Sequence, residues 1–369
     1  MKIPLGKPVF DEEMEQAAVD ALGNERFVLG ESVHKFEEEF AKYCGIDFAV
    51  STSSGTDALK IAMLAAGIKP GQAVVTSPAS FIASANAIIH AQGVPVFCDI
   101  NPETNNIDPQ KLEKAITAKT KAVIPVHLYG FPAEMDSIND LAKKHDLVVI
   151  EDACQAHGAS YHGERTGSLG LVGCFSFYPS KNMTVGGDGG MITTNDEKIA
   201  AAAAKLRDCG RKSQYVHDVV GFTSRLNSVN AAIGRVQLRR LDAWNDSRRQ
   251  AAKMYDRSLE GVGDLVLSPK GSATIEPVYH LYVIRTKHRD ELKSWLESQG
   301  IGCGIHYVLP IHLQPVYQEM FGYKEGAYPN AEELCNTCLT IPIFPNITED
   351  EILYITSNVH KFFANKQKG

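Results

Sequence analysis

Short apolar runs alternate with helix-like segments through the first half of this sequence. Five such runs begin near residues 48, 73, 94, 121 and 147, and each is too short to form a helix of its own. The segments between them, such as residues 56–67, have helical periodicity and end at a glycine or a polar turn. Strands that are almost wholly apolar and are separated by helices form parallel sheets covered on both faces. We therefore expect an α/β fold built on such a sheet.

The pattern changes after a glycine-rich loop near residue 187. Residues 228–261 are predicted to form one helix that is long enough to connect two lobes, and an α+β segment with an expected strand at residues 302–308 follows. A chain of 369 residues with 44% hydrophobic content can bury one large core and a smaller one. The sequence predicts a large domain of residues 1–245 and a small C-terminal domain of residues 246–369.

The charge balance argues against two classes of partner. The formal net charge is −7 and the pI is near 6.0, which is unlike a general binder of nucleic acid or of membrane surfaces. No run reaches the roughly 18 apolar residues of a membrane span, and the N-terminus lacks an apolar signal core. We expect a soluble cytoplasmic protein.

The eight cysteines are scattered along the chain, which is typical of reduced thiols in an intracellular protein. Cys335 and Cys338 form one C-x-x-C pair in a helix-like stretch. A structural zinc site needs four ligands, and no second pair follows. We expect buried or partly buried thiols and no metal site.

Ligands of open α/β sheets bind at the carboxyl ends of the strands, and three of these ends are informative. At the first, Gly55 and Thr56 begin a helix whose free N–H groups and dipole favour an anion, with an ordinary Ser/Thr cap as the alternative. The second ends in Glu151 and Asp152, with Gln155 three residues on. Neighbours on a strand point to opposite faces, so only one acid can face a given crevice. A carboxylate there can bind magnesium, a ribose hydroxyl or a protonated ring nitrogen, or it can act as a cap.

The third strand end carries a lysine, Lys181, which follows the aromatic run at residues 175–179. Apolar surroundings lower the pKa of an amine, which then forms a Schiff base with an aldehyde. An amine, an anion site and an acid are what pyridoxal phosphate requires, together with an aromatic side chain such as Phe81 on its ring. The nucleotide motifs G-x-x-x-x-G-K-[ST] and, after an early strand, G-x-G-x-x-G are absent from the sequence.

A set of motifs in fixed order resembles a known family. The motifs are SGTDAL, SPASFIASANAI, KAVIPVHLYG, VIEDACQAHGA, FSFYPSKN, GGDGGMITT, AAIGRVQL, YHLYVIR and HYVLPIHLQPVY. In these the chain resembles, over nearly its whole length, the pyridoxal-phosphate sugar aminotransferases of the DegT/DnrJ/EryC1/StrS group. The resemblance implies a fold-type-I transferase, pyridoxal phosphate as the cofactor, and a homodimer with shared active sites.

The resemblance also implies a role for each candidate residue. Lys181 would bind the cofactor covalently and move the substrate proton, Asp152 would pair with the pyridinium nitrogen, and Gln155 would contact the ring or its phenolic oxygen. The other implied cofactor contacts are Phe81 on a ring face and Gly55, Thr56 and Ser176 on the phosphate. Residues implied to contact the substrate sugar are Tyr178, His306, Tyr307 and His312.

One position departs from the family pattern. Members often read G-x-N-x-R before the long helix, where the asparagine reaches the phosphate of the neighbouring subunit's cofactor, whereas GFTSRL puts Thr223 here. A threonine hydroxyl still donates a hydrogen bond, with shorter reach. Arg225 is a second candidate for charge next to the cofactor or a nucleotide diphosphate. Arg248 and Arg249, in contrast, are predicted to lie on a solvated helix face.

The expected activity is the transfer of an amino group, from L-glutamate, to a nucleotide-linked keto sugar in amino sugar or polysaccharide biosynthesis. Members acting on 3-keto sugars tend to read HYP-x-P-x-HLQPAY, and the loop at residues 306–317 differs by carrying Val308 in place of the first proline. We therefore favour a 3-keto substrate, with a 4-keto sugar as the alternative. Two further alternatives are a pyridoxal-phosphate-dependent sugar dehydratase and a non-catalytic regulator. Dehydratases of this group have histidine in place of the lysine, so Lys181 argues against the first. A non-catalytic regulator would not need the lysine, the acid and the phosphate site together, which argues against the second.

Overall fold

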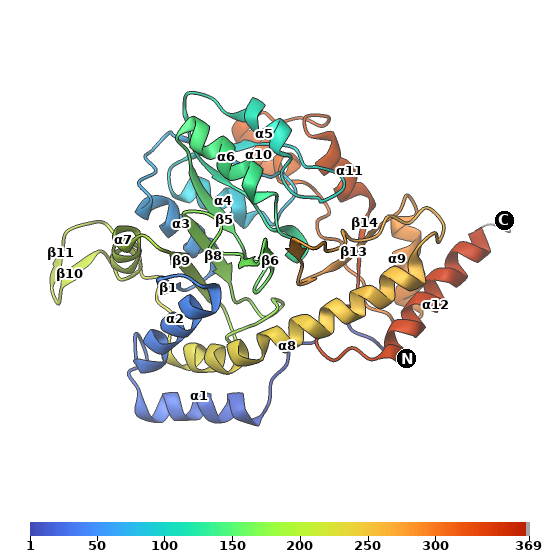
Figure 1. The fold of residues 1–369 in the computed structure, drawn as a ribbon, viewed down its shortest axis with the longest axis horizontal. Coiled ribbons are helices and arrows are strands. Elements are labelled where there is room, and N and C mark those ends of the chain that lie inside the picture. Colours follow the sequence, from blue (N-terminus) through green and yellow to red (C-terminus); the bar gives the residue numbers. More distant parts are fainter. Residues whose placement is uncertain (367–369) are drawn as a thin grey trace.

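The computed structural model describes residues 1–366 (Figure 1). Its centre is a seven-stranded sheet with the order β1-β9-β8-β5-β4-β2-β3. These strands are β1 (Phe48–Thr52), β2 (Ala73–Thr76), β3 (Val94–Phe97), β4 (Thr120–Ile124), β5 (Val148–Asp152), β8 (Val172–Ser176) and β9 (Gly190–Thr194). Neighbouring strands pair in parallel from β3 across to β8, while β9 is antiparallel to β8 and β1. The predicted fold class, an α/β protein with a mostly parallel sheet, is confirmed.

Helices cover both faces of this sheet. The alternation of buried side chains along each strand separates two cores, so that Val74 packs in one and its neighbour Val75 in the other. The first core includes residues of α3 (Gly55–Ala65), α4 (Ala83–His90) and α7 (Glu197–Arg207). The second includes residues of α5 (Pro109–Ala115) and α6 (Met135–His145). The helices cover the two faces of the sheet and leave the polar carboxyl ends of the strands at its edge.

The longest helix, α8 (Ser228–Leu259), runs from the large lobe into the smaller one (Figure 1). Its first part packs against α1 (Glu12–Asn24) and α2 (Glu31–Cys44), and its last turns join a separate apolar core with residues of the C-terminal lobe. The elements of that lobe are β13 (Tyr282–Arg285), α9 (Arg289–Ser298), α10 (Pro315–Phe321), α11 (Pro329–Thr337), β14 (Cys338–Ile341) and α12 (Glu349–Lys366). Residue 245 lies within α8, and the division of the chain there stays a prediction.

Short elements complete the fold. They are a small sheet of β6 (Ser160–Tyr161), β7 (Glu164–Arg165) and β12 (Ile275–Glu276), a hairpin of β10 (Arg211–Ser213) and β11 (Val216–His217), and the 3-10 turns η1 (Leu128–Gly130) and η2 (Ile311–Leu313). Figure 1 shows the hairpin projecting from the large lobe at the end far from the C-terminal lobe.

The expected strand at residues 302–308 is wrong. This segment forms only an isolated bridge between Gly304 and Thr340. The backbone at the start of this segment bonds to the N-terminal segment instead. The Ile3 N–H donates to the Gly300 carbonyl at 2.9 Å, and the Ile3 carbonyl accepts from the Gly302 N–H at 2.8 Å. The chain then turns toward the sheet, which brings residues 306 and 307 to the cavity described below.

The sequence also led to expectations about membrane spans and about the cysteines. No helix within residues 1–366 is long and apolar enough to cross a membrane, and a cytoplasmic location stays a prediction. Cys335 in α11 and Cys338 at the start of β14 are buried free thiols, as predicted.

Candidate active site

A cavity of about 690 Å³ lies at the carboxyl ends of β1, β5 and β8. The C-terminal lobe, one face of α8 and the N-terminal segment at residues 5–9 complete its wall. The sequence did not predict this use of the N-terminal segment, which carries no motif. The predicted site residues that line the cavity are Gly55, Thr56, Phe81, Asp152, Gln155, Ser176, Tyr178, Lys181, His306 and Tyr307.

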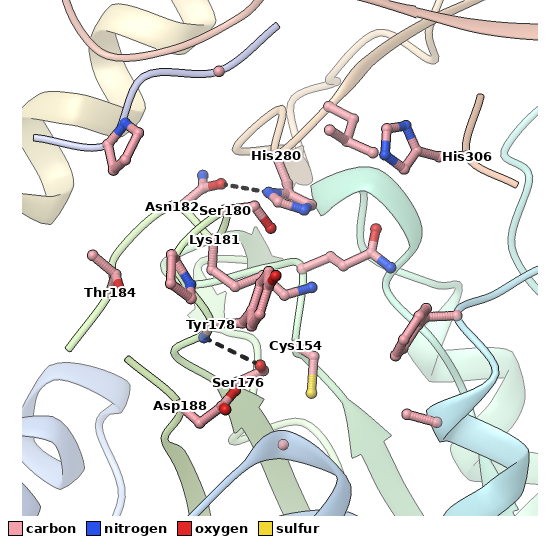
Figure 2. Close-up of a pocket in the computed structure, with 18 of the residues that line it drawn as sticks. Cys154, Ser176, Tyr178, Ser180, Lys181, Asn182, Thr184, Asp188, His280 and His306 are labelled. Carbon is pink, nitrogen blue, oxygen red and sulfur yellow. Dashed lines mark hydrogen bonds between the residues drawn. The ribbon is translucent and has the colours of Figure 1, made fainter. Parts of the chain in front are cut away.

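Lys181 lies in the loop after β8, and Figure 2 shows its side chain directed into the cavity. The aromatic residues before it explain its place, because Phe175 and Phe177 are fully buried in the core while Tyr178 is 54% exposed at the cavity. Burial lowers the pKa of the Lys181 ammonium, although the neighbouring Cys154 and Asp152 oppose this shift. The neutral, nucleophilic amine therefore forms at a lower pH than on an exposed lysine.

The start of α3 forms an anion site. Within residues 1–366 the N–H groups of Gly55 and Thr56 donate to no acceptor, because Ser54 caps the helix through the Asp57 N–H. A Cβ on Gly55 would lie 2.6 Å from the Ser176 Cβ, so only glycine lets the Ser176 hydroxyl lie against the helix end. Asp57 is held elsewhere by Lys60 and Ser224, at 2.5 and 2.8 Å. The helix dipole and these three free donors fit a phosphate.

Asp152 ends β5 with its carboxylate at the cavity. The Ser84 hydroxyl donates to Oδ2 at 2.6 Å and the Cys154 N–H donates to Oδ1 at 3.2 Å. Because Ser84 gives its only proton to Asp152, Ser80 donates to Ser84 across their 2.8 Å contact. A carboxylate has about four acceptor positions, and residues 1–366 fill two of them through these hydrogen bonds. Ser84 was not predicted, although it lies in the SPASFIASANAI motif.

The neighbouring acid, Glu151, points to the other face of β5 as strand alternation predicts. It is fully buried and accepts from the N–H groups of Gly167, Leu169 and Gly170 at 2.7 to 2.8 Å. His127 adds a fourth bond at 2.9 Å. The Ala133 N–H donates to His127 Nδ1, so Nε2 carries the proton and gives it to Glu151. His127 is therefore satisfied by backbone and Glu151 and does not line the cavity.

Two further predicted residues are held by hydrogen bonds at the cavity wall. Gln155 accepts from the Tyr129 N–H at 3.0 Å and donates to the Tyr307 hydroxyl at 3.3 Å. The Phe81 ring is 54% exposed, with its centroid 6.0 Å from that of Tyr307. Phe81 is thus free to cover a bound ring instead of being part of the core.

The sequence prediction missed two hydrogen-bonded residues next to Lys181, Asn182 and His280. His280 Nδ1 donates to the Asn182 Oδ1 at 3.2 Å (Figure 2). Asn182 also donates to Asn245 in α8 at 2.9 Å. Burial and the charge of Lys181 hold the pKa of His280 well below its ordinary value, so its ring is neutral. Asn182 lies in the motif FSFYPSKN and His280 in YHLYVIR, and these motifs could have pointed to both residues.

Three predicted residues are not part of this cavity. His312 is fully buried, bonds to Glu332 at 3.0 Å and packs against the Tyr328 ring. Thr223 is exposed near Cys209, and Arg225 forms an ion pair with Asp208 at 2.9 Å. The sugar contact expected of His312 is therefore wrong for this arrangement, because the aromatic cluster takes up its ring.

The expectation of a solvated face at Arg248 and Arg249 is half wrong. Arg249 is partly exposed and pairs with Asp246 and Glu276. Arg248 is only 5% exposed and lines the cavity, because residues 279–280 and 343 of the C-terminal lobe cover it. Segments distant in sequence thus bury one position of a helix whose local sequence indicates exposure to solvent.

Comparison with known proteins identifies the family of this chain. Residues 8–360 match the DegT/DnrJ/EryC1/StrS aminotransferase family. The chain belongs to this family. A "Pleiotropic regulatory protein" of Geobacillus stearothermophilus is 44% identical, covering 96% of this chain and 95% of its own. A dTDP-3-amino-3,4,6-trideoxy-alpha-D-glucose transaminase of Streptomyces venezuelae is 40% identical, covering 95% and 92%. The crystal structure of S. venezuelae DesV in complex with a ketimine intermediate has a TM-score of 0.94 at 38% identity, with 98% of each chain covered.

Family membership confirms the predicted enzyme class, a sugar aminotransferase that depends on pyridoxal phosphate. The residues of this aminotransferase fit the cofactor. A partly buried amine, a carboxylate with free acceptor positions and an unfilled cup of N–H donors lie in one cavity, as the aldehyde, ring nitrogen and phosphate require.

Proposed function

We propose that this protein transfers the amino group of L-glutamate to C3 of a keto sugar carried by a nucleotide. The observation that carries the proposal is that Lys181 and Asp152 share one cavity with His306 and Tyr307 of the predicted sugar loop. The name of the Streptomyces venezuelae relative, a transaminase of a dTDP-linked 3-amino sugar, supports both the nucleotide and the position.

Lys181 and Asp152 have the central roles in this proposal. When bound, pyridoxal phosphate supplies an aldehyde that takes up the amino group and a ring that withdraws electrons from the reacting carbon. Asp152 holds a proton on the ring nitrogen, since its carboxylate keeps acceptor positions open toward the cavity. Lys181 Nζ accepts a proton from the reacting carbon and returns it, for which a lowered pKa is suitable.

The remaining contacts position the cofactor and the sugar. The Gly55 and Thr56 N–H groups and the Ser176 hydroxyl would hold the phosphate, Phe81 would cover a ring face, and Gln155 would contact the ring, since all of these residues line the cavity. For the sugar we propose Tyr178, His306 and Tyr307. The His306 imidazole is oriented by a 2.8 Å hydrogen bond between its Nδ1 and Thr340, and Tyr307 is oriented by Gln155.

The position of amination is tested with matched substrates. Purified protein is offered L-glutamate with a 3-keto and a 4-keto form of the same nucleotide sugar, and the new amine is located by NMR. Nitrogen at C3 supports the proposal, and nitrogen only at C4 contradicts it. Replacing L-glutamate by L-glutamine in the same assay tests the donor.

We also propose a homodimer in which Thr223 and Arg225 serve the partner's site. Both residues lie outside the cavity of their own chain. The nearby hairpin and its flanking loop expose apolar side chains, with Tyr215 84% and Val220 92% exposed, which suits a covered interface.

Subunit mixing tests this arrangement. A Lys181→Ala chain and a Thr223→Ala/Arg225→Ala chain should each be inactive as homodimers, and a mixture should regain activity because one heterodimer site is intact. A mixture that exchanges subunits, shown by a tag on one chain, yet stays inactive would falsify shared sites.

A further inference from the structure

Arg248 is a buried cation at the cavity wall that the proposed chemistry above does not use. Gln237, Trp244 and Arg248 follow one another along α8 at spacings of seven and four residues, which place helical side chains on one face. Its side chain is 5% exposed. The cavity therefore contains a guanidinium group in addition to the Lys181 amine.

No carboxylate within residues 1–366 pairs with this guanidinium. Nη1 donates to the carbonyl oxygens of Tyr279, His280 and Ile343 at 3.1 to 3.3 Å, Nε is buried without a partner, and Nη2 donates to nothing in this part of the chain. Burial lowers the pKa of Arg248 to about 10, so it is charged at neutral pH. A buried charge without a counter-ion is costly.

Another arginine provides a matched contrast. Arg207 is also 5% exposed, but it forms an ion pair with Glu37 and two further bonds to Ser51. The neighbour Arg249 pairs with two acids. The fold thus supplies counter-ions to these two arginines and leaves Arg248 with neutral acceptors at the wall of a cavity.

The position of Arg248 favours a small anion near Lys181. Its acceptor His280 bonds to Asn182, the residue after Lys181, so these groups form one connected wall. The phosphate site at α3 is formed by other residues. The amino donor must place its nitrogen beside Lys181, where the cofactor aldehyde would lie, and an amino acid carries a carboxylate on the same carbon as its amine.

Resting on the proposed amino-transfer function, we propose that Arg248 binds a carboxylate of the amino-acid donor. Of the three nitrogens of this forked, planar group, Nη1 is occupied by carbonyl oxygens and Nε is enclosed, so the carboxylate would bind at Nη2, whose N–H groups have no acceptor within residues 1–366. The three carbonyl bonds through Nη1 fix the plane of the group before the donor arrives. Donor binding supplies the counter-ion that the protein lacks.

The test separates the two halves of the reaction. Holoenzyme is mixed with L-glutamate alone, and conversion of the cofactor to its amino form is followed by absorbance; the amino form is then mixed with the keto sugar alone. In Arg248→Gln the apparent Kd for L-glutamate should rise ~10- to 100-fold, and the sugar half should keep its rate. Arg249→Gln is the matched control and should match wild type in both halves.

A binding measurement gives a second readout. Glutarate, which has two carboxylates and no amine, should bind wild-type holoenzyme in calorimetry and bind Arg248→Gln at least ~10-fold more weakly. If Arg248→Gln does not fold, Arg248→Lys keeps the charge and loses the fork, and a weakened glutamate half still supports the proposal. An equal loss with L-glutamate and L-glutamine assigns the α-carboxylate, and a loss only with L-glutamate assigns the side-chain carboxylate.

Other outcomes overturn the assignment. Unchanged glutamate and glutarate affinity in a folded variant, or equal losses in both halves, shows that Arg248 is structural. A loss confined to the sugar half shows that it binds the nucleotide sugar. Wild type that reacts with glutamate but aminates no nucleotide sugar refutes the proposed acceptor and leaves the Arg248 result standing, whereas wild type that reacts with no amino acid refutes the Arg248 assignment.

Discussion

Glu151 and Asp152 are adjacent acids on one strand that meet opposite surroundings. Glu151 is enclosed on one side of the sheet by four donors, three of them backbone N–H groups of residues 167–170. Asp152 faces the cavity on the other side, where the protein supplies two donors. The same functional group thus organises a loop in one place and remains available to a ligand in the other.

The number of unfilled acceptor positions separates these roles better than burial does, since both side chains are almost inaccessible to solvent. A carboxylate whose acceptor positions are filled by backbone stabilises the fold, and one with open positions can hold a ligand proton. If this comparison is correct, substitutions on the cavity side reduce turnover, and substitutions on the Glu151 side reduce stability.

The largest effect is expected on the cavity side at Lys181. Lys181→Ala should lower turnover by at least ~10³-fold, because the substitution removes the buried amine proposed to move the substrate proton. Its melting temperature should stay near that of wild type. Borohydride treatment of wild-type holoenzyme, followed by peptide mass spectrometry, should find the cofactor fixed on the Lys181 peptide, and a label on another lysine contradicts the assignment.

Asp152→Asn is the next test of the same side. The substitution keeps the shape and removes the charge, and the lost electrostatic stabilisation should lower turnover by at least ~10²-fold. Thermal unfolding should change little. Turnover near the wild-type value would remove the contrast between the two acids and point to Glu151 as the partner of the ring nitrogen.

Glu151→Gln tests the other side of the strand. Its amide NH₂ would face groups that are all donors, so the free energy of unfolding should fall by about 3 kcal/mol. Urea titration followed by circular dichroism measures this change. Turnover per folded molecule should remain within about twofold of wild type, and a large loss of turnover without a loss of stability would break the comparison.

Ser84→Ala gives the smallest effect and sharpens the account of Asp152. It removes one of two donors to the carboxylate, which is worth about 1 kcal/mol, or a roughly fivefold loss of turnover. Steady-state kinetics measure this loss. Ser80→Ala is the matched control, because it keeps Ser84, the direct donor to Asp152. A loss as large as that of Asp152→Asn would show that Ser84 has a role beyond orienting the acid.

Local pattern was enough to predict the sheet, the opposite directions of Glu151 and Asp152, and Lys181 at a strand end, because each follows from a few consecutive residues. It failed where distant segments decide the surroundings. Arg248 belongs to a charge-rich helical run, and only the C-terminal lobe buries it. His312 belongs to a motif whose first two residues reach the cavity while it packs in an aromatic cluster.

The continuous helix α8 also limits how this protein can change in evolution. One residue inserted between Gln237 and Arg248 would turn the arginine by about 100° around the helix axis and move it by about 1.5 Å. Arg248 would then lose its three carbonyl partners, which belong to other segments. We expect related sequences to substitute residues in this part of α8 while keeping its length, and to place insertions and deletions outside this helix.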